Sequence, residues 1–98
     1  MIKSFADKKT AAVFANLRVS MFGPDFLRIA QRKLAQLNRV ASVEELRIPP
    51  GNRLEKLSGD REGQWSIRIN DQWRVCFDWR DGNAWEVKRS WIITDGGE

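Results

Sequence analysis

The sequence contains no histidine, no tyrosine and only one cysteine, Cys76. These absences exclude a disulfide within the chain and a zinc site built from cysteine and histidine, and we expect no metal and no cofactor. No run of about 18 apolar residues is present, and the segment MIKSFADKKT lacks the apolar stretch of a secretory signal. We therefore expect a cytoplasmic protein with no membrane partner.

What the chain does contain indicates one folded domain over residues 1–98. Its 42% hydrophobic and 31% charged residues, with five tryptophans, are typical of a globular rather than a disordered protein. The net charge of +4 is unevenly placed, because residues 1–40 carry eight basic and two acidic side chains and residues 41–98 carry nine and eleven. The basic N-terminal half favours a polyanionic partner.

The first half of the chain predicts one short strand followed by two or three helices. Residues 2–5 can form the strand, and Asp7 is placed to cap the first helix. Pro24 suits the first turn of the second helix, and Ser42 with Glu45 has the capping-box spacing of a third, one-turn helix. The apolar residues of the first helix include Val13, Phe14, Leu17 and Met21. Those of the second form a stripe that we expect to cover the sheet, made of Leu27, Ala30, Leu34 and Leu37.

The second half predicts an antiparallel meander. Residues 53–57 alternate imperfectly, 65–69 and 73–77 alternate cleanly, and another strand follows the turn signal Asp81-Gly82. Residues 94–98 have the composition of a frayed tail. The fold class is therefore α+β, with an N-terminal strand and two or three helices packed on an antiparallel sheet.

The parity of the two clean strands sets their register. Side chains alternate across a strand, so a single apolar face requires paired residue numbers whose sum is even. A connection made of residues 70–72 meets this condition, and it places Arg68 opposite Arg74 on the face away from the apolar side chains. The same parity in the next hairpin, with 77 opposite 85, puts Glu86 on the arginine face and Lys88 opposite Arg74.

Two arginines opposite each other have two interpretations. Directly opposed like charges on a sheet cost about a few tenths of a kcal/mol or more. In the first interpretation Asp78 and Glu86 neutralise the arginines on a solvated face. In the second, an anion such as a phosphate binds between them, and the residue pattern leaves both open.

Other candidate residues favour structural roles. The side chain of Cys76 has no histidine to generate a thiolate, so we expect it to pack on the sheet. The basic face of the second helix is either solvated or contacts nucleic acid or an acidic partner, and it consists of Arg28, Arg32 and Arg39. Tryptophans can stack on nucleic-acid bases, but alternation along the strands puts four of them on the core face, so we expect them to pack in the core. They are Trp65, Trp73, Trp79 and Trp85.

Three segments carry a resemblance to a known family. MIKSF at 1–5, IPPGNRLEKL at 48–57 and GDREGQWSIRINDQWRVCF at 59–77 resemble the HigB-type killer toxins of type II toxin–antitoxin systems, within the RelE/ParE superfamily. The resemblance implies a RelE-like fold and a HigA-like, helix-turn-helix antitoxin as partner. In the RNA-cleaving members it also implies a ribosome-dependent endonuclease that cuts mRNA during translation.

The resemblance also implies roles for individual residues. Arg74, in QWRVCF, matches the family arginine that holds the scissile phosphate, and Arg61, in GDREG, matches a basic position beside the same groove. Arg68, Lys88 and Arg53 are then expected to contact the nucleic acid.

The chain departs from the family pattern at its C-terminal end and at Ser58. Family members commonly end in an acidic residue, a tyrosine and a histidine, and the corresponding residues here are Trp91, Ile92 and Ile93. Many relatives have lysine where this chain has Ser58, and Lys56 is the expected substitute.

These departures leave few groups for proton transfer. The candidates are Lys56, Glu86 and Lys88, and we place the first two with Arg61 and Arg74 in the catalytic set. Two functions remain open. One is an mRNA endonuclease weakened by the missing histidine; the other is a non-catalytic partner of the antitoxin that acts as co-repressor, or a gyrase inhibitor of the ParE kind.

Overall fold

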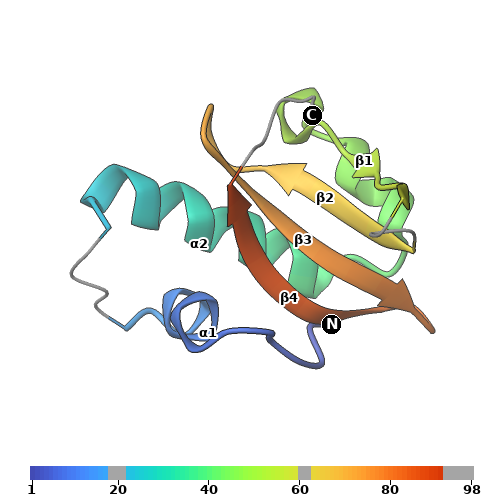
Figure 1. Ribbon diagram of the computed structural model, residues 1–98, viewed down its shortest axis with the longest axis horizontal. Helices are drawn as coiled ribbons and strands as arrows, with labels where there is room; N and C mark the ends of the chain where they lie inside the picture. Colours follow the sequence, from blue (N-terminus) through green and yellow to red (C-terminus); the bar gives the residue numbers. More distant parts are fainter. Residues whose placement is uncertain (18–21, 60–62, 92–98) are drawn as a thin grey trace.

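The computed structural model describes residues 1–17, 22–59 and 63–91, and it has the expected α+β arrangement (Figure 1). Over these residues the elements are α1 (Lys8–Phe14), α2 (Pro24–Arg39), the 3-10 turns η1 (Val43–Arg47) and η2 (Pro50–Asn52), β1 (Glu55–Lys56), β2 (Gln64–Arg68), β3 (Trp73–Arg80) and β4 (Asn83–Trp91). The strands form one antiparallel sheet in the order β1-β2-β3-β4, which confirms the predicted meander. In the described ranges, no helix has both the length and the apolar character needed to cross a membrane.

The second helix follows the sequence prediction closely. Pro24 begins α2, Asp25 lies in its first turn and Arg39 in its last turn, so both charges oppose the helix dipole favourably. The apolar stripe faces the sheet, with Ala30, Leu34 and Leu37 buried and Leu27 half-buried.

The first helix is shorter than its apolar spacing suggests. Asp7 caps α1 by accepting a hydrogen bond from the Thr10 amide at 2.7 Å, as predicted, but the helix ends at Phe14. Asn16 then takes a left-handed conformation with φ of 63°, which ends helical geometry. Leu17 therefore lies beyond α1 and is 61% exposed, so its assignment to the first helix was wrong. Met21 lies outside the described residues.

The predicted N-terminal strand contacts the sheet at only two points. Ile2 and Phe5 make isolated parallel bridges to Ala84 and Val87 of β4. Hydrogen bonds from the Lys3 amide to the Ala84 carbonyl at 2.8 Å and from the Ala6 amide to the Val87 carbonyl at 2.9 Å hold the segment along that edge. The residues are extended as predicted, but no regular strand forms.

The first hairpin has the register that parity requires. Trp65 pairs with Phe77, Ile67 with Val75 and Arg68 with Arg74. The connecting loop is closed by Asn70, whose side-chain oxygen accepts hydrogen bonds from the Gln72 and Trp73 amides, both at 2.8 Å. Ile67, Val75 and Phe77 are buried against α2, so the predicted core face is confirmed.

The second hairpin departs from the predicted register because β4 contains a bulge. Its two-residue turn, Asp81-Gly82, has positive φ at both residues, as a type I′ turn requires. Asp78 then pairs with Trp85 but Cys76 pairs with Lys88, so one extra residue lies in β4, and Glu86 has a φ of 53° there.

The bulge corrects two assignments. Lys88 lies opposite Cys76 and not opposite Arg74. Trp85 lies opposite Asp78, which removes it from the core face, and its ring packs under the Arg80 guanidinium, 4.9 Å from the ring centre. Cys76 itself is buried, as expected.

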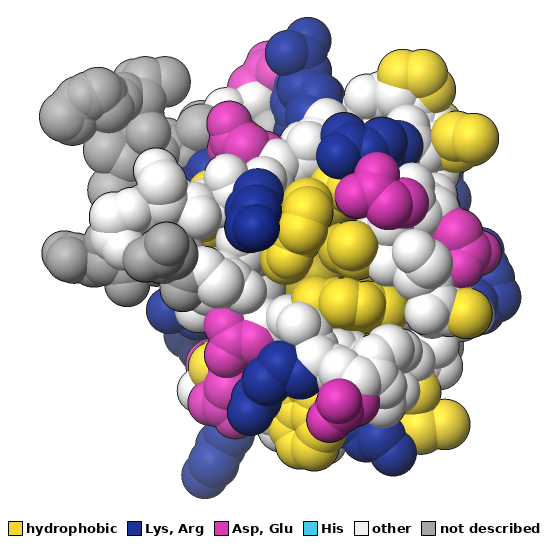
Figure 2. Space-filling model, turned by 90° about the vertical axis from the view of Figure 1, so that its right-hand side faces the viewer, with side chains coloured by type: hydrophobic (Ala, Val, Ile, Leu, Met, Phe, Trp, Pro, Cys, Tyr) yellow, Lys and Arg dark blue, Asp and Glu magenta, His cyan; other side chains and the backbone are white. Residues whose placement is uncertain are grey.

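The β1 side of the molecule carries apolar surface within a ring of charged side chains (Figure 2). Half-buried Leu54, Trp65 and Trp79 pack against the core. The Lys56 ammonium lies 5.7 Å from the centre of the Trp65 ring, so its aliphatic chain and charge cover part of that tryptophan.

Candidate nucleic-acid interface

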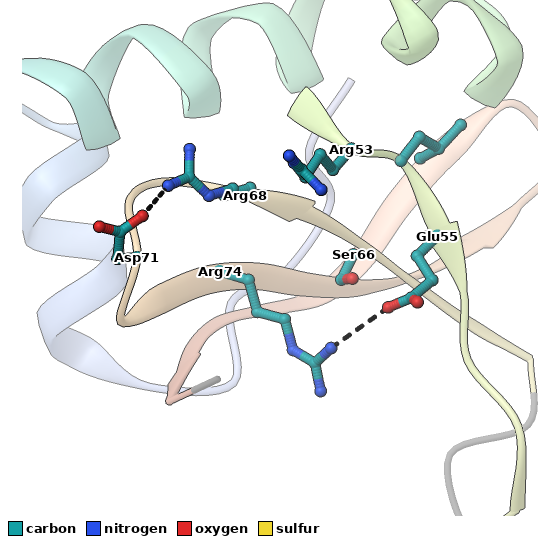
Figure 3. A pocket seen from close by; sticks show the side chains of 7 residues that line it. Arg53, Glu55, Ser66, Arg68, Asp71 and Arg74 are labelled. Atoms are coloured by element: carbon teal, nitrogen blue, oxygen red, sulfur yellow. Dashed lines mark hydrogen bonds and ion pairs between the residues drawn. The ribbon is translucent and has the colours of Figure 1, made fainter. Parts of the chain in front are cut away.

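The candidate site is a pocket of about 500 Å³ on the sheet face opposite the core (Figure 3). Three of the sequence-predicted residues meet there: Arg53 before β1, Arg68 at the end of β2 and Arg74 at the start of β3. The remaining lining residues are Leu54, Glu55, Ser66 and Asp71. The sequence placed Arg68 and Arg74 side by side, and the fold adds Arg53 to them.

Each of the two paired arginines has a carboxylate partner. Arg74 Nη1 lies 3.5 Å from Glu55 Oε1 of β1, and Arg68 forms an ion pair with Asp71 of the hairpin loop. The guanidinium groups consequently extend in different directions in Figure 3. The acidic partners predicted from the sequence, Asp78 and Glu86, were the wrong ones.

Burial differs between these partners. The Arg74 side chain is 18% exposed, whereas that of Glu55 is 64% exposed. The Nε atom of Arg74 is buried and makes no hydrogen bond within the described part of the chain. A buried donor without a partner is costly, and Nε is too buried for an incoming group to reach. The guanidinium has five N–H donors and contacts Glu55 through Nη1, so the capacity for an incoming acceptor lies in its Nη groups.

The loop before β1 sets the position of Arg53. Asn52 is fully buried, and its amide nitrogen donates to Gln36 Oε1 at 2.9 Å and to the Leu46 carbonyl at 3.0 Å, while its oxygen accepts from Lys33. These bonds fix the loop to α2 and η1. Arg53 follows in a left-handed conformation, with φ of 46° and ψ of 55°, and lines the pocket.

Lys33 is a residue near the site that the sequence analysis missed. It lies on α2, and its pKa is lowered, first by burial and then by the positive charges of Arg32 and Arg68. The coupling to Arg68 means that the positive potential of the pocket extends onto α2. The sequence could have indicated this position. Lys33 lies four residues before the buried Leu37, so both project from the same side of α2 and Lys33 borders the packed face.

Three predicted site residues do not line the pocket. Lys56 pairs with Trp65 on the core-facing side, so alternation turns it away from the arginines. Glu86 is held at the bulge by the N-terminal segment, accepting a hydrogen bond from the Ser4 hydroxyl at 3.0 Å. Lys88 lies opposite Cys76, two residues farther along β3 than Arg74. Arg61, Ile92 and Ile93 lie outside the described residues.

The pocket has the side chains of an anion-binding site that also contains two carboxylates. Three guanidinium groups and two carboxylates give a net positive charge, and planar guanidinium forks match the oxygens of a phosphate. Within the described ranges no group of His, Cys, Asp or Glu side chains is placed to hold a metal ion. The arrangement can therefore bind a phosphodiester through side chains alone.

Comparisons with known proteins identify the family of the chain. Residues 3–89 match the model of the HigB-like toxin family, described as RelE-like toxin of type II toxin-antitoxin system HigB. Toxin HigB-1 of Vibrio cholerae serotype O1 is 51% identical over 53 residues, and the chain covers only 56% of its length. Endoribonuclease HigB of Proteus vulgaris is 34% identical over 86 residues, which are 87% of this chain and 91% of that protein. The chain therefore belongs to the HigB-like family of RelE-like toxins, which implies an antitoxin partner.

Proposed function

We propose that this protein is a toxin that cleaves mRNA on the ribosome, with its RNA-binding site in the pocket of Arg53, Arg68 and Arg74. The observation that carries the proposal is that these three arginines line one pocket on the sheet face opposite the core. The name of the Proteus vulgaris relative, an endoribonuclease, supports the same activity. A function in translation places the protein in the cytoplasm.

The proposed chemistry is attack of a ribose 2′-hydroxyl on the adjacent phosphate. The attacked phosphate gains negative charge in the transition state, and preorganised cations stabilise that charge more than they stabilise the ground state. Arg74 is the arginine best suited to this role, because its side chain is 18% exposed against 35% for Arg68 and is therefore held more rigidly. Arg68 and Arg53 would bind neighbouring phosphates.

The proposed partners follow from the family and from the charge distribution. A HigA-like antitoxin of the helix-turn-helix class would neutralise the toxin, and the ribosome would present the mRNA. The excess of basic residues in the first 40 positions supports a polyanionic partner such as ribosomal RNA. The non-catalytic and gyrase-inhibitor alternatives lose support, because both named relatives are HigB toxins.

Cleavage by the purified protein tests the proposal. We expect cuts in an mRNA engaged by translating ribosomes and a loss of about 100-fold or more in cleavage rate for Arg74→Met, as found when one transition-state donor is removed. Arg80→Met is the matched control, since Arg80 also lies on β3 but stacks on Trp85 outside the pocket. Intact mRNA after incubation with the unaltered protein and active ribosomes would contradict the proposed function.

A further inference from the structure

The three proton-transfer candidates selected from the sequence do not line the arginine pocket. Lys56 packs on Trp65, Glu86 bonds to Ser4 and Lys88 pairs with Cys76. Among the described residues, the carboxylates that line the arginine pocket are those of Glu55 and Asp71. The two differ in which arginine they contact.

Glu55 is the carboxylate next to the phosphate-binding arginine. Its Oε1 atom lies 3.5 Å from Arg74 Nη1, and the side chain reaches across from β1, the edge strand, to β3 (Figure 3). Asp71 instead pairs with Arg68 from the hairpin loop and is 92% exposed. A guanidinium has five N–H donors in one plane, so Arg74 can hold Glu55 through Nη1 and a phosphate oxygen through another nitrogen.

That arrangement fixes the distance between carboxylate and phosphate. Two acceptors on neighbouring edges of one guanidinium lie within a few ångströms of each other, which is also the separation of a phosphate from the 2′-hydroxyl of the preceding ribose. The exposed Glu55 carboxylate can therefore contact the hydroxyl while Arg74 holds the phosphate. The Glu55 side chain is 64% exposed, so a substrate group can approach it from solvent.

We propose that Glu55 is the general base of the cleavage reaction, an inference that rests on the proposed endonuclease activity. The Glu55 carboxylate takes the proton of the 2′-hydroxyl as the O–H bond breaks, and the 2′-oxygen forms a bond to phosphorus. The bond from phosphorus to the 5′-oxygen breaks, and that oxygen takes a proton from solvent water. The products are a 2′,3′-cyclic phosphate and a 5′-hydroxyl, and Glu55 then returns its proton to water.

This assignment accounts for the missing histidine. A carboxylate held beside an arginine can take a proton in a chain that has no histidine. The charged groups that line the pocket with Glu55 are Arg74 on β3, Arg68 on β2, Arg53 before β1 and Asp71 in the hairpin loop.

Single-turnover cleavage of ribosome-bound mRNA by Glu55→Gln tests the inference, with RNA affinity measured on the same samples. We expect the rate to fall about 100-fold or more, the usual contribution of a general base, and the affinity to stay within about threefold. Glutamine keeps an oxygen that can accept from Arg74 Nη1, so a purely structural role of Glu55 would survive this change. Glu44→Gln is the matched control, because Glu44 is also an exposed glutamate paired with an arginine, Arg47, but lies on η1.

A second variant, Glu55→His, adds a pH readout. We expect it to cleave faster than Glu55→Gln, with a rate that falls below a pH of about 6.5 as the imidazole becomes protonated. Glu55→Gln cleaving within threefold of the unaltered protein would overturn the inference, and so would parallel losses of RNA affinity and rate or a histidine variant no faster than the glutamine variant at any pH. The proposed function would stand in those cases, whereas failure of the unaltered protein to cleave would defeat the function itself.

Discussion

The two faces of the sheet are built on different principles. On the core face, Ile67, Val75 and Phe77 are buried to within 1% of their surface and held by packing against α2. On the opposite face, Ser66 and Cys76 are also buried, but the functional side chains form ion pairs at the surface, and the acids of these pairs are 64% and 92% exposed. Close packing holds the side chains of the core face, whereas ion pairs hold those of the opposite face.

The difference explains how a stable domain can carry an adaptable site. Buried side chains of the core are costly to move, because the interior is close-packed. Exposed ion pairs contribute only about 0–1 kcal/mol each, so Arg68 can exchange Asp71, which is 92% exposed, for a phosphate at little cost in stability. Arg74 can keep Glu55 at Nη1 while another of its nitrogens binds a phosphate. Both arginines are positioned by the strands and remain able to bind an anion.

Removing a large core side chain should have the greatest effect on stability. Phe77→Ala should lower the free energy of unfolding by about 3–5 kcal/mol, because it leaves a cavity in a fully buried site. Arg74→Met, on the neighbouring face, should change it by less than about 1 kcal/mol. Denaturant unfolding of both variants measures the contrast, and comparable losses would mean that the two faces do not differ as described.

The buried amide of Asn52 sharpens the comparison, because it is a polar residue held as rigidly as the core. Asn52→Ala should cost about 1–3 kcal/mol of unfolding free energy, since the bonds to Gln36, the Leu46 carbonyl and Lys33 are lost together. Asn83→Ala is the control, because its amide makes only an exposed bond to the Asp81 carbonyl. Equal stability of the two variants in urea would show that the Asn52 network does not anchor the loop.

The Asp71 carboxylate should compete with RNA for Arg68. Asp71→Asn removes one negative charge from the pocket, and we expect RNA to bind about two- to fivefold more tightly, in line with the modest energy of an exposed pair. Titration of a short single-stranded RNA at fixed salt measures this gain. Asp25→Asn removes a similarly exposed acid paired with Arg28 on α2, and an equal gain there would mean that only net charge matters.

The smallest expected effect is on the pKa of Lys33, which should report the positive potential around the pocket. Because the charges of Arg32 and Arg68 lower this pKa, Arg32→Gln and Arg68→Gln should each raise it, the former more, and NMR titration of the lysine side chain measures both shifts. Burial remains in both variants and keeps the pKa below its usual range. A pKa that stays constant on removal of Arg68 would separate Lys33 from the pocket.

The core face could be predicted from the sequence because parity and helical spacing act over short distances. Residues 65–69 and 73–77 alternate cleanly, and this fixed both the register and the pairing of Arg68 with Arg74. The bulge at Glu86 could not be predicted, because no sequence pattern indicates a glutamate in the left-handed conformation. This one extra residue changed the pairing partners of both Trp85 and Lys88.

The site was only partly predictable for a related reason. Strand parity brought Arg68 and Arg74 together, but Glu55 contacts Arg74 across 19 positions of sequence and lies on a strand of two residues. Such a short strand has too little alternation to reveal which side chain faces the pocket. Lys56 was chosen as the substitute for the lysine that many relatives have at Ser58, whereas the pairing of Glu55 with Ser66 puts Glu55 on the pocket face.

The salt dependence of RNA binding tests most directly whether the arginine pocket holds RNA phosphates. The logarithm of the binding constant should fall linearly with the logarithm of salt concentration, and each lost phosphate contact on a single strand should reduce the slope by about 0.7. We predict this reduction for Arg74→Met and an unchanged slope for Arg80→Met, whose arginine stacks on Trp85 away from the pocket. Equal slopes for the unaltered protein and Arg74→Met would contradict the account.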